Sequence, residues 1–147
     1  MKRKDHIRDY ATEAFRFYAK SGGKETYIKT LVDDINKSKG AGISNPTESA
    51  LVSKEKVIES RAAELADIEA VEKVLSILAK LSQGEYIKKS IELVYFRDCW
   101  KDITWGEITD RIIKAEIEIP ASRAQIYRWL RKARELFAEE RGLRLIA

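Results

Sequence analysis

The chain has 147 residues, of which 44% are hydrophobic and 35% charged, with a net charge of +4, one cysteine and one histidine. This length fits one domain with at most a small appendage, and the composition excludes a wholly disordered chain and, because the apolar runs are short, a transmembrane protein. A single cysteine and a single histidine exclude an internal disulfide and the usual structural zinc site, and we expect a cytoplasmic protein with no signal peptide and no cofactor.

A pair of helices is predicted in residues 1–44. The first runs from Asp5 to about Lys20, with its apolar residues on one broad face, and Ser21-Gly22-Gly23 ends it because glycine enters the left-handed conformation without a steric cost. The second covers Lys24 to about Lys37. Residues 38–46 are predicted to form a loop.

One long central helix is predicted in residues 45–81. Asn45-Pro46-Thr47-Glu48 has the capping residues of a helix start, and no glycine or proline follows before the helix ends. Such a helix is either an oligomerisation arm or a bundle helix with one exposed half, and the sequence leaves both open. Its apolar stripe consists of Leu51, Ile58, Ala62, Leu65, Ile68, Val71, Leu75 and Leu78.

Three further helices are predicted in residues 82–147. Capping boxes at Ser82–Glu85 and Thr104–Glu107 begin the first two, and the second is expected to fade near Lys114–Glu116. The stretch "AEIEIP" (115–120) is the only one that hints at a strand. Ser122 with Gln125 caps the last helix, expected over Arg123 to about Arg141. The predicted fold is therefore all-α, with a C-terminal helix-turn-helix.

The net charge is confined to the end of the chain. Residues 1–121 contain 21 basic and 21 acidic residues, whereas residues 122–147 contain seven basic and three acidic ones. A basic helix attached to a neutral body favours a polyanionic partner. The alternative is a well-solvated amphipathic helix whose cations pair with its own glutamates.

The last helix has the two faces of a recognition helix. Ile126, Leu130, Ala133 and Phe137 share one face, which we expect to be buried with Trp129 at its edge. Arginine and glutamine pair with guanine and adenine in the major groove, and tyrosine, lysine and further arginines reach phosphates. The candidate residues for binding double-stranded DNA are Arg123, Gln125, Tyr127, Arg128, Arg131 and Lys132, with Arg134 near the backbone and Lys101, Thr104 and Arg111 near phosphates from the preceding helix.

The stretch "DITWGEITDRI … ASRAQIYRWLRKARELF" resembles the C-terminal helix-turn-helix of sigma-factor region 4 and of phage late-gene transcription activators of the ArpU/RinA type. The resemblance covers about the last third of the chain, and "RDYATEAFRFYA" also resembles prophage-borne proteins that end in a similar basic helix. One departure is that "IKAEIEIP" makes the connection between the two helices longer than in those families. The matching residues are Thr104, Trp105, Glu107, Ile108, Ser122, Arg123, Ile126, Tyr127 and Arg128.

This resemblance implies a prophage-derived transcriptional regulator that acts on DNA, with RNA polymerase as a further partner. The N-terminal helices would then form a homo-oligomer, with a dimer favoured. Two alternatives stay open: a small terminase-like DNA packaging adaptor, and a helical protein-interaction module without a nucleic-acid role. We do not expect an enzyme, because the chain has no phosphate-binding loop and no Ser/His/Asp or Cys/His set.

Overall fold

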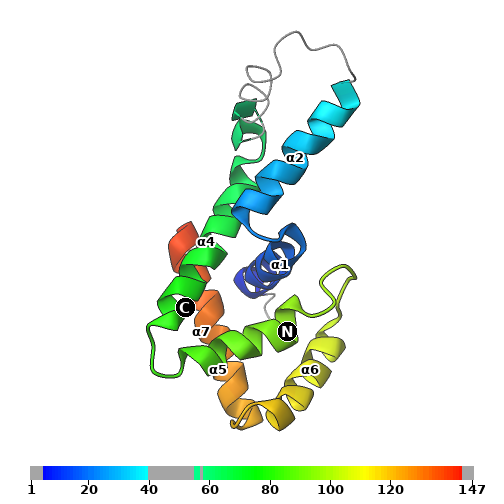
Figure 1. The fold of residues 1–147 in the computed structure, drawn as a ribbon. Coiled ribbons are helices and arrows are strands. Elements are labelled where there is room, and N and C mark those ends of the chain that lie inside the picture. The colour runs from blue at the N-terminus through cyan, green and yellow to red at the C-terminus, as the bar shows by residue number, and fades with distance from the viewer. Residues whose placement is uncertain (1–4, 40–54, 57, 144–147) are drawn as a thin grey trace.

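The computed structural model describes residues 5–39, 55–56 and 58–143, and every regular element in this part of the chain is helical, which confirms the all-α prediction. Figure 1 shows their arrangement. The elements are α1 (His6–Ser21), α2 (Lys24–Lys39), α4 (Ala62–Ala79), α5 (Gly84–Ile91), the π-helical turn η1 (Glu92–Phe96), α6 (Trp105–Glu118) and α7 (Arg123–Arg141).

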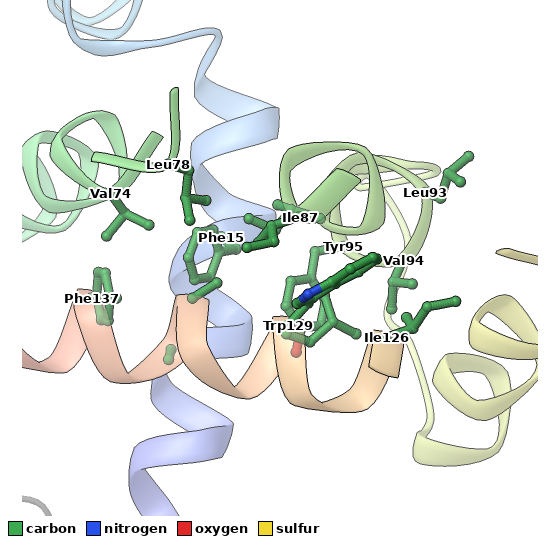
Figure 2. Close-up of a cluster of buried hydrophobic side chains, with 14 of the residues drawn as sticks. Phe15, Val74, Leu78, Ile87, Leu93, Val94, Tyr95, Ile126, Trp129 and Phe137 are labelled. Carbon is green, nitrogen blue, oxygen red and sulfur yellow. The ribbon is translucent and has the colours of Figure 1, made fainter. Parts of the chain in front are cut away.

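Helix α7 is the centre of the fold, and it packs against α1, α4, α5 and α6. Figure 2 shows its inner side chains in order along the helix, with Phe137 near Val74 and Phe15, and with Trp129 and Ile126 near Tyr95 and Val94. The rings of Phe15 and Phe137 lie 5.9 Å apart, and those of Phe15 and Tyr95 lie 5.7 Å apart. The N-terminal helix α1 and the C-terminal helix α7 therefore share one core.

An arm extends from this core. It consists of α2 and the first half of α4, which lie side by side and point away from α5 and α6 (Figure 1). Ile28 of α2 and Leu65 and Ile68 of α4 are buried there, and the edge of Tyr27 meets the ring of Phe17 of α1 at 5.4 Å. These contacts attach the arm to α1 by a small apolar cluster.

The N-terminal helices agree with the sequence pattern. The Asp5 side chain accepts a hydrogen bond from the Arg8 N–H, and Gly22 ends α1 in the left-handed conformation with a φ of 75°. Helix α2 continues to Lys39, so the first two residues of the predicted loop are helical. The remainder of that loop, residues 40–46, lies outside the described residues.

The predicted central helix is interrupted. Residues 58–60 are helical, but Arg61 leaves the helical conformation with a φ of −116° and a ψ of 25°, and α4 begins at Ala62. The prediction of one unbroken helix is therefore wrong in this part, where residues 58–63 are exposed. The predicted cap at Asn45–Glu48 lies outside the described residues. The apolar stripe is confirmed at Leu65, Ile68, Val71 and Leu78, which are all buried.

The capping box predicted at Ser82 does not form. Helix α5 begins at Gly84, its cap residue is Gln83, and no side chain caps it. The cause is the tight turn from α4, in which a Cβ atom at Gly84 would lie 1.6 Å from the Leu78 carbonyl oxygen. Tertiary packing therefore sets this helix start.

The caps of the last two helices form as predicted. The Thr104 hydroxyl accepts from the Glu107 N–H at 3.2 Å, and the Ser122 hydroxyl accepts from the Gln125 N–H at 3.2 Å. Helix α6, however, continues to Glu118, so both its predicted end near Lys114–Glu116 and the hint of a strand at 115–120 are wrong. Burial of Ala115 and Ile119 against the core favours the additional helical turn.

Candidate nucleic-acid interface

Helix α7 separates its apolar and cationic residues as predicted. Ile126, Leu130, Ala133 and Phe137 are each at most 1% exposed. Trp129 is also buried, so it belongs to this face rather than to its edge. Its ring stacks on Tyr86 of α5, with 6.2 Å between ring centroids and 12° between planes. The inner face of α7 is therefore fixed by packing.

Five of the six candidate side chains are exposed on the outer side of α7, and Gln125 is half-buried. We call four of the exposed residues, Arg123, Arg128, Arg131 and Lys132, the cationic face. Tyr127 lies among them and is 42% exposed. Figure 1 shows that the first turns of α7, which carry Arg123, Tyr127 and Arg128, lie at the end of the molecule where α6 and α7 meet.

Two members of the cationic face pair with carboxylates of the chain. Arg123 Nε lies 2.7 Å from Glu116 Oε1 of α6, and Arg131 Nε lies 3.2 Å from Glu135 Oε1 one turn along α7. Arg128 Nε instead approaches the Ala124 carbonyl oxygen at 3.4 Å, and no carboxylate among the described residues pairs with it. Exposed pairs of this kind contribute about 0–1 kcal/mol, so a phosphate can replace the carboxylate partner.

Two arginines expected near the DNA backbone turn inward. Arg134 Nη1 donates to the Tyr95 hydroxyl at 2.8 Å across the core. Arg111 of α6, only 13% exposed, donates through Nη1 to the carbonyl oxygens of Val94 at 3.0 Å and Arg97 at 2.5 Å. The expected phosphate contact of Arg111 stays a prediction, but the Arg111 guanidinium is turned toward the fold, because it donates to carbonyl oxygens at the end of η1. Burial lowers the pKa of Arg111, and the nearby Arg16 guanidinium adds to this effect.

The start of α6 remains available to a ligand. Thr104 and Lys101 are exposed, as the expected phosphate contacts require. Trp105 is 46% exposed, and the Arg8 guanidinium of α1 lies 4.2 Å above its ring. This cation–π contact brings a cation of α1 to the first turn of α6, which the sequence pattern did not indicate because the two residues are far apart in the chain.

The connection between α6 and α7 is short. It consists of residues 119–122, and the Ala121 N–H bonds the Ile119 carbonyl oxygen at 2.7 Å. Most of the apparently long connection "IKAEIEIP" is the last part of α6. The departure from the helix-turn-helix spacing therefore reflects a longer first helix, while the turn itself stays short.

Metal-ligand clusters and membrane-spanning helices are both absent from the part of the chain that the structure describes. No group of three His, Cys, Asp or Glu side chains among those residues is arranged to hold a metal ion. None of their helices combines the length and apolar character needed to cross a membrane.

Comparison of the chain with protein-family models, curated proteins and solved structures gives no significant match. The resemblance to sigma-factor region 4 and to ArpU/RinA-type activators thus rests on the quoted residues alone.

Proposed function

We propose that the protein binds double-stranded DNA, with α6 and α7 as a helix-turn-helix and α7 as the recognition helix. The observation that carries this proposal is the division of α7, whose apolar side is held in the core while Arg123, Tyr127 and Arg128 face outward at an exposed end of the molecule. The short connection at residues 119–122 supports it, because helix-turn-helix pairs require the second helix to follow the first closely.

The first turns of α7 would enter the major groove. Arg123 and Arg128 lie on these turns, where a guanidinium can donate to both O6 and N7 of guanine. Tyr127 supplies a hydroxyl, and Arg131 and Lys132 lie further along the helix, where phosphates of the groove wall are nearer. The half-buried Gln125 has less freedom to reach a base than these neighbours.

Fluorescence anisotropy with labelled 30-base-pair duplexes of mixed sequence tests this proposal at about 50 mM salt, where contacts to phosphates dominate binding. We expect the logarithm of the association constant to fall linearly with the logarithm of the salt concentration. Arg128→Ala should weaken it about tenfold or more, as loss of one well-placed charged contact does. The matched control is Lys73→Ala, because Lys73 is exposed on α4, and α4 lies away from the first turns of α7 (Figure 1). Absence of salt-sensitive binding would rule the proposal out.

We further propose a role in transcription regulation, with RNA polymerase as a partner and a dimer as the active form. This part rests on the resemblance of the last third of the chain. The projecting arm supports a second candidate, a terminase-like packaging adaptor that assembles into a ring (Figure 1). Light scattering separates the two, because a regulator of this kind would be a dimer and a ring would contain eight or more copies. If the chain binds no DNA, a protein-interaction module is the remaining candidate.

A further inference from the structure

We propose that a cavity between η1 and α6 binds a phosphate-type oxyanion. The cavity has a volume of about 110 Å³, and it lies between the turn that follows η1 and the second half of α6. Its charged lining residues are Arg97, Asp98, Arg111, Lys114 and Glu118.

The positive charge at this cavity is poorly neutralised. Both hydrogen bonds of the Arg111 guanidinium go to carbonyl oxygens, and the nearest carboxylate oxygen, Asp98 Oδ2, lies 3.9 Å from Nη2. The Asp98 side chain is itself 67% exposed. Carbonyl groups contribute dipoles rather than a full negative charge, and buried charges in proteins are normally paired. Arg111 therefore has one long ion pair, to an exposed carboxylate, and no hydrogen bond to a carboxylate.

The buried guanidinium of Arg16 adds positive charge near this cavity. Arg16 of α1 is 2% exposed and donates to the carbonyl oxygens of Tyr95 at 3.1 Å, Asp98 at 3.0 Å and Lys101 at 2.6 Å. It thus lies behind the same turn whose residues line the cavity, and none of its bonds reaches a carboxylate. The buried Arg16 and the half-buried Arg111 thus both donate to carbonyl oxygens of this turn.

The rim of the cavity carries two more cations, and the cavity volume limits the size of the ligand. Arg97 and Lys114 are exposed, so both side chains can turn toward an anion in the cavity. The carboxylates of Asp98 and Glu118 are also at the rim, and they keep the affinity modest. A cavity of about 150 Å³ accommodates benzene, so this smaller one suits a single tetrahedral oxyanion rather than a nucleotide. Such an anion is either free inorganic phosphate or a phosphodiester group of a nucleic acid.

Thermal unfolding of the full chain in sodium phosphate, against sodium chloride of matched ionic strength, tests the site. We expect Tm to rise with the logarithm of the phosphate concentration above Kd, reaching about 3 °C when phosphate exceeds its Kd tenfold. Lys114→Gln and Arg97→Gln should abolish the rise, and Lys88→Gln, at an exposed position of α5 outside the cavity, should keep it. Arg111 is left unchanged in this test because its substitution also removes structural hydrogen bonds.

A second measurement separates the two sources of phosphate. If free phosphate has no effect but Lys114→Gln weakens duplex binding more than Lys88→Gln does, the ligand is the phosphodiester backbone. If neither free phosphate nor duplex binding depends on Lys114 and Arg97, the oxyanion site does not exist. The phosphate titration contains no nucleic acid, so its result is independent of whether the chain binds DNA through α7.

Discussion

Arg16 of α1 donates from Nη1 to the carbonyl oxygen of Tyr95 at 3.1 Å, across 79 residues of sequence. The same guanidinium reaches the carbonyl oxygens of Asp98 and Lys101, so one side chain satisfies three acceptors where the π-helical turn ends. Buried carbonyls need such partners, and the chain leaves regular helix at this point. Arg16 thereby fixes the start of the segment that leads into α6.

Arg16→Ala should lower the free energy of unfolding by about 3 kcal/mol, because it removes a buried donor from three carbonyl oxygens. Arg16→Lys keeps the charge but supplies a single donor atom, so we expect a smaller loss of about 1–2 kcal/mol. Urea unfolding measures both. Glu13→Ala, at an exposed position of α1, is the control and should change stability by no more than about 0.5 kcal/mol. Equal effects of the Ala and Lys variants would contradict the multiple-acceptor role.

The two glycines that lie in the first turns of α5 and α6 should respond in opposite ways to alanine. A Cβ atom at Gly84 would lie 1.6 Å from the Leu78 carbonyl oxygen, so Gly84→Ala must shift the backbone and cost about 3 kcal/mol. At Gly106 the nearest atom would be Thr104 Oγ1 at 3.7 Å, so Gly106→Ala should stabilise α6 by about 0.5–1 kcal/mol. Thermal unfolding compares the two variants, and a tolerated Gly84→Ala would show that the turn between α4 and α5 is looser than described.

Tyr10→Phe should show that the Tyr10 hydroxyl contributes to the free energy of unfolding at neutral pH and that this contribution is lost in alkali. The Tyr10 hydroxyl donates to Asp67 Oδ1 at 2.7 Å, so its loss should cost about 1 kcal/mol at pH 7. Burial raises the pKa of Tyr10, Asp67 adds to the rise, and Arg141 opposes it. A raised folded-state pKa means that the contribution is complete below the unfolded value of about 10 and is lost as pH rises through the folded pKa.

Urea unfolding of wild type and Tyr10→Phe between pH 8 and pH 11 checks this. The difference between the two proteins should be constant up to about pH 10 and shrink above it. Taking the difference removes alkaline effects that both proteins share. A difference that stays constant through pH 11 would mean that the Tyr10 pKa is not raised by folding.

Glu116→Gln should strengthen DNA binding, because Glu116 competes with phosphate for Arg123 at 2.7 Å. We expect about a twofold to fivefold gain in affinity, the range that an exposed ion pair is worth. Asp110→Asn removes an equal charge from an exposed position of the same helix and serves as the control in the anisotropy assay. In an Arg123→Ala background the gain should vanish. A gain that persists there would show that net charge, rather than the pair, is responsible.

Local chemistry in the sequence predicted a large part of the fold. The caps at Thr104 and Ser122 and the glycine end at Gly22 depend on hydrogen bonds within a few residues, and all three are present. The buried face of α7 followed from its periodicity. The Ser82 cap failed because contact with Leu78 in α4 decides where α5 begins, and the length of α6 was underestimated because burial of its last turn is a tertiary effect.

The candidate site was also predicted only in part, because some of its side chains are placed by tertiary contacts. Exposure of Arg123 and Arg128 follows from helical spacing, which the sequence contains. Arg111 and Arg134 point inward because they donate to the Val94 carbonyl and the Tyr95 hydroxyl of η1. No local sequence pattern identifies those acceptors. The pairing of Arg123 with Glu116 likewise depends on how α6 turns into α7.

Helix α7 is one unbroken rod of about 28 Å, given its 19 residues. Its far end is anchored where Arg141 meets Asp67 at 2.7 Å, and Asp67 in turn holds Tyr10. The end proposed to meet DNA is therefore continuous in backbone with the anchored end, and α7 contains no break between them. Helix α4 belongs to the arm and also packs against α7. If two copies were joined through their arms, the distance between their DNA-facing ends would therefore be fixed by the packing of α4 on α7.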